Sequence, residues 1–168
     1  MISDLVRAEL SRTDWASLEC GCGDSAEHLP LMFEVILTAE SPREMIGYTL
    51  EGHVEAESNI VACSAPAVGV IMSALAGEIS PLARGVLLQT LEFVAAGGDD
   101  ECGARAQEGF RTLLHLGLTG DAQDAETVAD ICACFGLGGQ DADFYDALLR
   151  ERAATKTKRR RRTVRGAR

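Results

Sequence analysis

The sequence predicts an all-α fold, a right-handed solenoid of about three helical hairpins with a capping helix at each end. Two Ser-Pro pairs, Ser41-Pro42 and Ser80-Pro81, each open a long segment with helical apolar spacing, and they lie 39 residues apart. Each pair follows another apolar segment with a proline near its start, Pro30 or Pro66. Recurrence at this spacing is typical of solenoids, because one hairpin cannot bury its apolar face alone.

Capping residues and apolar periodicity define the expected helices in chain order. Ser41 caps a helix, Pro42 presets its first turn, and Glu44 completes a capping box. Gly97-Gly98 ends the helix that Ser80 begins. The expected helices span about residues 2–12, 24–37, 41–55, 64–76, 80–96, 102–114, 124–135 and 141–153. No segment shows the alternating pattern of a strand.

Charge divides the 168-residue chain into two unequal parts. Residues 156–168 contain eight basic residues and no acidic one. Residues 1–155 contain all 26 acidic residues and eight arginines, which gives them a net charge of −18. We therefore expect one helical-repeat domain over residues 1–155 and a basic, disordered tail over residues 156–168.

The composition favours neither a membrane protein nor a secreted one. No run of 18 apolar residues is present, so we expect no membrane span and no membrane partner. The first 15 residues, MISDLVRAELSRTDW, include acidic residues and no long apolar block, unlike a signal peptide. A cytoplasmic location is the resulting expectation, and there the six cysteines are expected to be reduced.

Several short motifs resemble small HEAT-like proteins of the type common in actinobacteria. They are Asp14-Trp15, Gly23-Asp24, Ser64-Ala65-Pro66 and the Gly-Gly after the fifth helix. The resemblance implies HEAT-type hairpins stacked between about residues 24 and 136, with a cap at each end. Members of that group often carry His-Gln-Gly before the second hairpin, where this chain has Ala56-Glu57-Ser58-Asn59. The shared motifs are structural and identify no catalytic residue.

The cysteine spacing predicts no metal site within one chain, and no other cofactor. Cys20-Gly-Cys22 and Cys132-Ala-Cys134 look like two halves of a four-thiolate site. However, residues two apart on a helix point about 200° apart, and the two pairs are separated by two hairpins. Cys20 and Cys22 lie in a Gly-rich loop, where two alternatives stay open, a redox role and metal binding across a dimer.

The motifs of common enzyme classes are missing from the sequence. It has no P-loop, no nucleophile elbow and no HExxH. Gly21-Cys-Gly23-Asp-Ser-Ala26 matches the letters of a dinucleotide fingerprint but lacks a preceding strand. His28, His53 and His115 do not form the repeated His-Glu pairs of metal-binding HEAT hydroxylases. We therefore expect a non-enzymatic protein.

The tail is the strongest chemical feature of the sequence. Eight cations in thirteen residues bind phosphate backbones by counterion release, without sequence preference. The alternatives are contact with an acidic protein surface, including the body of the same chain, and a charged solubility tail without a specific role. The candidate polyanion-binding residues are Lys156, Lys158, Arg159, Arg160, Arg161, Arg162, Arg165 and Arg168.

In helical solenoids the second helix of each hairpin usually lines the concave face. Here those helices begin near Ser41, Ser80 and Asp124, and their charged residues are mostly acidic. We therefore expect a protein–protein interaction module that binds a basic peptide or protein through an acidic concave face. The alternatives are a nucleic-acid-associated protein that uses the tail and an immunity or antitoxin-like inhibitor. The predicted partner-binding residues are Arg43, Glu51, Glu55, Arg84, Glu92, Glu126 and Asp130.

Overall fold

The computed structural model describes residues 2–56 and 59–165 and is mostly helical, which confirms the expected all-α class. In the described residues the α-helices are α1 (Asp4–Ser11), α2 (Leu29–Thr38), α3 (Ser64–Leu75), α4 (Pro81–Ala96), α5 (Asp100–Glu108), α6 (Phe110–Thr119), α7 (Ala122–Phe135) and α8 (Ala142–Arg165). Short 3-10 helices are η1 (Trp15–Ser17), η2 (Ala26–His28), η3 (Pro42–Met45) and η4 (Gly139–Asp141). Two-residue strands β1 (Glu55–Ala56) and β2 (Asn59–Ile60) pair antiparallel.

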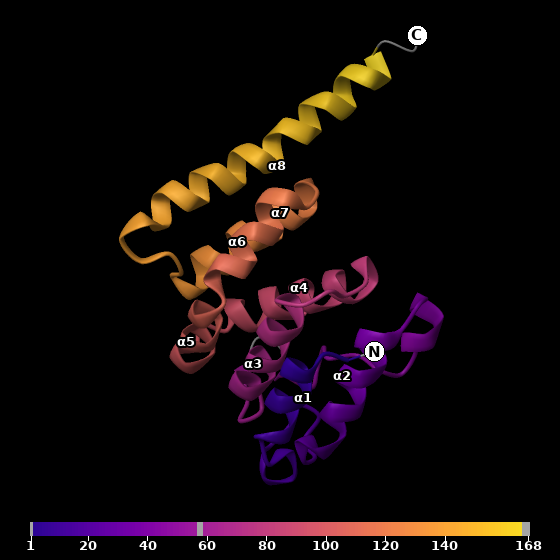
Figure 1. Cartoon of the computed structure of the whole chain (residues 1–168). Helices are drawn as coiled ribbons and strands as arrows, with labels where there is room; N and C mark the ends of the chain where they lie inside the picture. The colour runs from indigo at the N-terminus through magenta and orange to yellow at the C-terminus, as the bar shows by residue number, and fades with distance from the viewer. Residues whose placement is uncertain (1, 57–58, 166–168) are drawn as a thin grey trace.

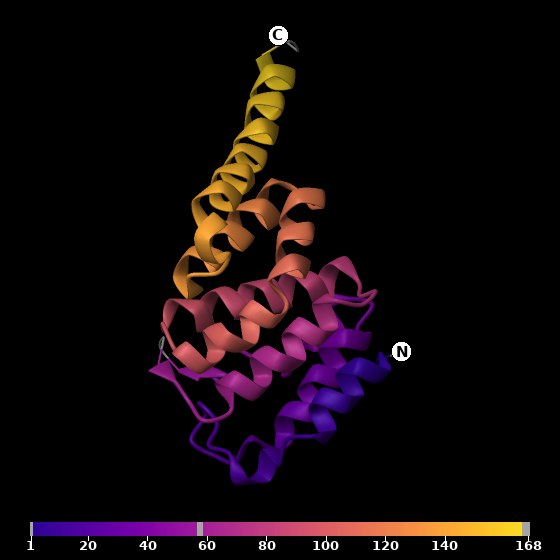
Figure 2. The same cartoon turned by 60° about the vertical axis from the view of Figure 1, so that its left-hand side comes forward.

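Two series of helix contacts run through the molecule (Figures 1 and 2). In the first series α1 packs on α3, and α3 packs on α5. In the second series α2 packs on α4, and α4 packs on α7. α3 also packs on α4, and α8 packs on α6 and α7. One cluster of buried apolar side chains, with Phe33, Ile71, Leu91 and Ile131 among its largest members, joins the elements.

The start of α4 is where the sequence predicts it, at a single capping residue. The hydroxyl of Ser80 accepts a hydrogen bond from the N–H of Ala83 at 3.1 Å, and Pro81 is the first residue of α4. α7 begins two residues before its predicted start at Asp124. There the carboxylate of Asp121 accepts hydrogen bonds from the backbone and completes a capping box with Asp124.

The predicted helix over residues 41–55 is wrong, because the chain forms only the 3-10 turn η3 there. The hydroxyl of Ser41 donates to the Glu44 carboxylate at 2.8 Å and does not cap a backbone N–H. Further along, Gly47 and Gly52 have φ of +86° and +76°, which a right-handed helix cannot contain. The first predicted hairpin therefore lacks its second helix, and a loop takes its place.

The predicted helix over residues 102–114 is divided into α5 and α6. α5 ends at Glu108, and Gly109 lies against the side chain of Met72 on α3. The C-cap at Gly109 has a φ of −106°, outside the helical range, so the chain changes direction before α6. The break leaves room for Met72 between the two helices.

α8 is 24 residues long and continues as helical backbone through Arg165, over most of the segment for which the sequence predicts a disordered tail. Alanine, lysine and arginine all have high helix propensity, which accounts for this continuation. In both views the C-terminal half of α8 projects beyond the other helices (Figures 1 and 2). Among the residues that the structure describes, neither α8 nor another helix is long and apolar enough to span a membrane.

Candidate functional site

Three of the predicted partner-binding residues gather where α4 packs on α7. Glu92 of α4 is half-buried and faces the carboxylates of Glu126 and Asp130 on α7. Burial and then the charges of Asp130 and Glu126 raise the pKa of Glu92 above its usual value. Arg150 of α8, which also packs on α7, forms an ion pair with Asp130 at 2.8 Å. We call the surface of Glu92, Glu126 and Asp130 the acidic face.

Arg84 also lies between these two helices, but it is already paired. Its guanidinium is 3.5 Å from the carboxylate of Asp124, the N3 residue of α7. The pair connects the start of α4 to the start of α7. Arg84 therefore contributes to the packing of these helices, and its charge is partly balanced within the fold.

Glu51 lies next to α4, in a recess of about 220 Å³. The loop that replaces the predicted helix over residues 41–55 forms one wall of the recess, and α4 forms the other. Phe93 of α4 is 37% exposed there, which is unusual for so large an apolar side chain. The recess is lined by Met45, Tyr48, Thr49, Glu51, Val86, Gln89, Thr90 and Phe93.

The remaining predicted charges do not join the acidic face. Glu55 is only 6% exposed, and its carboxylate accepts a hydrogen bond from the N–H of Gly52 at 3.4 Å, so its assignment to a binding surface is wrong. Arg43 is exposed on η3. Of the polyanion-binding set, residues 156–165 lie on the α8 backbone, and Arg168 lies outside the described residues.

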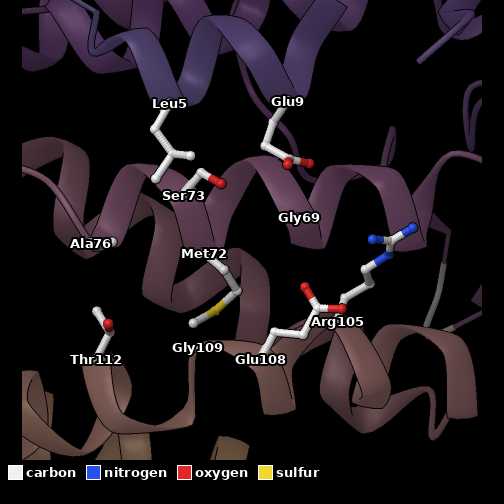
Figure 3. Close-up of a pocket in the computed structure, with 10 residues that line it drawn as sticks. All are labelled: Leu5, Glu9, Gly69, Met72, Ser73, Ala76, Arg105, Glu108, Gly109 and Thr112. Atoms are coloured by element: carbon white, nitrogen blue, oxygen red, sulfur yellow. The ribbon is translucent and has the colours of Figure 1, made fainter. Parts of the chain in front are cut away.

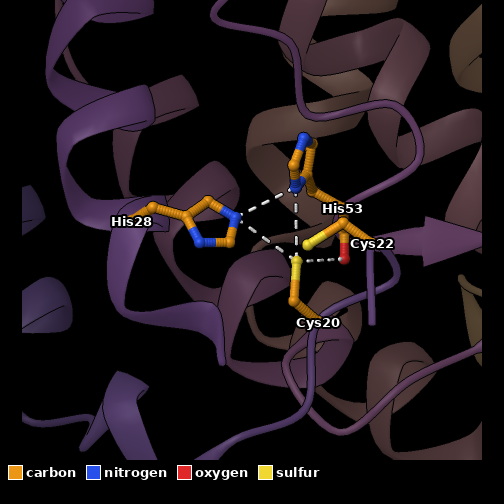
Figure 4. A group of neighbouring side chains, drawn as sticks. All are labelled: Cys20, Cys22, His28 and His53. Carbon is orange, nitrogen blue, oxygen red and sulfur yellow. Dashed lines mark hydrogen bonds between the residues drawn. The ribbon is translucent and has the colours of Figure 1, made fainter. Parts of the chain in front are cut away.

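Four side chains with metal-binding atoms converge beside the start of α2 (Figure 4). Cys20 and Cys22 come from the loop after η1, His28 is the last residue of η2, and His53 lies in the loop before β1. Their candidate ligand atoms all lie within 4.8 Å of one another. We call these four residues the Cys-His cluster.

Three of the atoms form a tight triangle. Cys20 Sγ lies 3.4 Å from His28 Nε2 and 3.3 Å from His53 Nδ1. The two ring nitrogens are 2.9 Å apart. Cys20 is 1% exposed, both histidines are half-buried, and Cys22 is exposed at the edge of the cluster.

The backbone around Gly21 brings the two cysteines to His53. The N–H of Gly21 donates to the carbonyl oxygen of His53 at 2.7 Å. An added Cβ at Gly21 would lie 2.7 Å from the carbonyl oxygen of Gly52, so a larger residue would force the two loops apart. Gly23, with a φ of +89°, then turns the chain back, and its N–H donates to the Cys20 carbonyl at 2.9 Å.

Burial disfavours the charged forms of Cys20 and His53. It raises the pKa of Cys20, and it lowers the pKa of His53, which the charge of His28 lowers further. Cys63, at the start of α3, is fully buried beside Cys20, and both thiols lie 3.4 Å from the His53 carbonyl oxygen. Burial raises the pKa of Cys63 to about 12. A neutral imidazole has a free ring nitrogen, which is the form that binds metals.

The sequence predicts no pairing of Cys20-Gly-Cys22 with Cys132-Ala-Cys134 in one metal site. In the structure the second pair lies on α7, with one thiol buried and the other exposed, as the helical geometry predicts. The overlooked signal is partly local, because His28 follows Cys22 by six residues. Nothing in the sequence places His53 near these residues, since on the helix predicted over residues 41–55 its side chain would point away from them.

A different recess, of about 200 Å³, lies between α1, α3 and the α5–α6 junction (Figure 3). Its polar side chains include Glu9, Arg105 and Glu108 beside the apolar Leu5 and Met72. None of the residues singled out from the sequence lies in it. This mixture of both charges and apolar surface indicates no particular ligand chemistry.

No family model matches the chain, and no curated protein and no solved structure matches it either. The resemblance to HEAT-like proteins therefore depends on the sequence landmarks alone. The acidic face and the Cys-His cluster are therefore the features that bear on function.

Proposed function

We propose that this protein is a non-enzymatic binding module whose acidic face takes a basic peptide or protein. In a HEAT-like solenoid, which we propose for these packed helices, α4 and α7 belong to the series of second helices, whereas α2 is the first helix of its hairpin. That series usually lines the concave face. The acidic face would then lie inside the groove, where an extended partner can contact α4 and α7 together.

The observation that supports the proposal best is the crowding of carboxylates across α4 and α7. Burial and the charges of Asp130 and Glu126 raise the pKa of Glu92, so its ionised form is disfavoured in the free protein. Among the described side chains, neither Glu92 nor Glu126 forms an ion pair. A cation bound here relieves this repulsion, so a basic partner gains affinity from it.

The recess beside Glu51 supplies an anchor for one basic side chain. The aliphatic stem of lysine or arginine packs well against aromatic rings, here those of Tyr48 and Phe93. Its charged head would reach the Glu51 carboxylate at the wall of the recess. A partner with two or more spaced basic residues therefore fits this surface better than an isolated cation does.

The test uses a fluorescent peptide with the sequence of residues 156–168 as the basic probe, with anisotropy measured at physiological ionic strength. The double variant Glu92→Lys/Glu126→Lys should bind the peptide about tenfold more weakly, since each exposed charge pair contributes roughly 0.7 kcal/mol. The matched control, Glu101→Lys/Glu108→Lys on α5, changes the net charge equally and should bind within about twofold of the wild type.

Two outcomes contradict the proposal. Unchanged binding by the α4–α7 double variant would show that the acidic face is not the binding surface for the peptide. Equal losses in both double variants would show that the peptide senses only the overall charge. Circular dichroism of each variant separates loss of binding from loss of fold.

The helical extension of α8 favours a second candidate, a nucleic-acid-associated protein. The extension carries the predicted polyanion-binding residues through Arg165 away from the acidic body (Figures 1 and 2). A phosphate backbone that approaches this extension meets less repulsion than one that approaches the body. In this case the extension provides affinity for nucleic acid, and the acidic face recruits a second partner.

A further inference from the structure

The Cys-His cluster has the spacing of a tetrahedral metal site. In such a site, metal–nitrogen bonds of about 2.0–2.1 Å and metal–sulfur bonds of about 2.3 Å place two nitrogens about 3.3 Å apart and sulfur about 3.6 Å from nitrogen. The corresponding distances here are 2.9 Å between the ring nitrogens of His28 and His53, and 3.3 and 3.4 Å from these to Cys20 Sγ. Small outward movements of the side chains would therefore admit an ion.

The fourth donor completes the set. Cys22 lies at the exposed edge, with its ligand atom within 4.8 Å of the other three. Four protein ligands fill the coordination shell of a tetrahedral ion and leave no open position for a substrate. This arrangement is that of a structural site rather than a catalytic one.

The chemistry of the donors selects the metal. Two thiolates and two imidazoles suit a borderline-soft ion, whereas calcium and magnesium require oxygen ligands. Binding releases the two thiol protons to solvent, and the two thiolate charges balance the charge of a divalent ion. A buried thiolate at Cys20, which is costly alone, is then neutralised at the site.

We propose that Cys20, Cys22, His28 and His53 bind one zinc ion in a Cys2His2 site that fixes the N-terminal third of the fold. This inference is independent of the acidic face and of its partner. It differs from the expectation drawn from the sequence, which found no metal site within a single chain.

The position of the site explains what the metal would stabilise. Its ligands connect the loop after η1, the start of α2 and the loop before β1, which have few helical hydrogen bonds of their own. This is the region where the second helix of the first hairpin is missing. A zinc ion linking residues 20–28 to residue 53 supplies a connection that packing of that helix would otherwise provide.

The first experiment measures zinc in tag-free protein purified under reducing conditions and dialysed against metal-free buffer. We expect inductively coupled plasma mass spectrometry to find one zinc per chain. Replacement by Co(II) should give the visible absorption of tetrahedral cobalt and the near-ultraviolet charge transfer of cobalt–thiolate bonds. Absence of stoichiometric metal, together with failure of the apo protein to take up Zn(II) or Co(II), would overturn the proposal and leave a histidine–histidine hydrogen bond at the site.

Variants identify the ligands. Cys22→Ser and His28→Gln should lower zinc affinity by more than about 100-fold, since even outer-shell changes cost 10–100-fold. Because Cys22 is exposed, its serine variant is not expected to perturb the core. Cys134→Ser is the matched control, an exposed cysteine on α7, and should bind zinc like the wild type.

Thiol labelling gives a readout that does not depend on variant stability. In wild-type protein, zinc should slow alkylation of Cys22 but leave alkylation of Cys134 unchanged, because only the first thiol becomes a ligand. Equal reactivity of Cys22 with and without zinc would overturn its place in the site. Full zinc affinity in either ligand variant would overturn the Cys2His2 assignment.

Discussion

Substitution of Gly21 by alanine tests the loop contact that assembles the Cys-His cluster. The added Cβ would lie 2.7 Å from the carbonyl oxygen of Gly52 and 3.0 Å from that of Glu55. Both are backbone atoms, so no side-chain rotation can relieve the contact. The two loops must separate, which strains the 2.7 Å hydrogen bond from the Gly21 N–H to the carbonyl oxygen of His53.

The magnitude of the effect can be worked out from these contacts. Overpacking costs about 1–3 kcal/mol, and loss of one hydrogen bond costs about 1 kcal/mol. The smaller entropy of the unfolded chain with alanine offsets about 0.5–1 kcal/mol. The free energy of unfolding should therefore fall by about 2 kcal/mol, which lowers the melting temperature by on the order of 5 °C.

Urea and thermal denaturation of the reduced protein measure this difference. The matched control is Gly85→Ala in α4, where an added Cβ meets no atom within 4 Å. Since glycine is a poor helix former, the control should gain about 0.5–1 kcal/mol. A Gly21→Ala variant as stable as the wild type would refute the contact between the two loops, and with it the arrangement of the cluster.

Two more predictions concern the electrostatics of the body and the tail. Because burial and neighbouring carboxylates raise the folded-state pKa of Glu92, its ionised form destabilises the fold above that pKa, and the penalty disappears as the pH falls through it. Glu92→Gln should therefore raise the melting temperature at neutral pH and lose this advantage at about pH 4, below the ordinary glutamate pKa of 4.5. The control variant Glu101→Gln on α5 should not gain stability in this way. An equal gain of Glu92→Gln at both pH values would contradict the raised pKa of Glu92. If the tail binds duplex DNA, the slope of the logarithm of the binding constant against the logarithm of the salt concentration should lie between about −4 and −7. Binding should also vanish in a chain ending at Thr155. Retained binding by this shortened chain would show that the tail is not the DNA-binding segment.

Helices whose starts are decided by local interactions could be predicted from the sequence. α3 and α4 were predicted closely, and at α4 this is because Ser80 caps the start of the helix and a continuous apolar stripe follows. At Ser41 an identical Ser-Pro pair also predicts a helix start, but no α-helix forms there. There the hydroxyl of Ser41 is satisfied by Glu44, and the residues that follow include Gly47 and Gly52 with positive φ. A capping motif thus predicts a possible helix start, while the following apolar stripe decides whether the helix forms.

The complete Cys-His cluster could not be predicted from local interactions. Cys20 and His53 are 33 residues apart, and their side chains meet only because the chain between them folds as α2 and a loop. Had residues 41–55 been helical, as predicted, His53 would have stood on a helix surface. The error in the secondary structure and the missed cluster therefore have one cause.

The metal proposal and the binding proposal meet at this loop, although their evidence is independent. Glu92 and Glu126 stand on α4 and α7, which pack on each other without any contribution from the Cys-His cluster. Glu51 is different, because it lies two residues before His53, in the loop that forms one wall of the recess. A metal that fixes His53 also fixes the position of Glu51 relative to Phe93. The acidic face thus depends only on the packing of α4 and α7. The recess beside Glu51 also depends on the proposed zinc site, which fixes the loop formed in place of the predicted helix over residues 41–55.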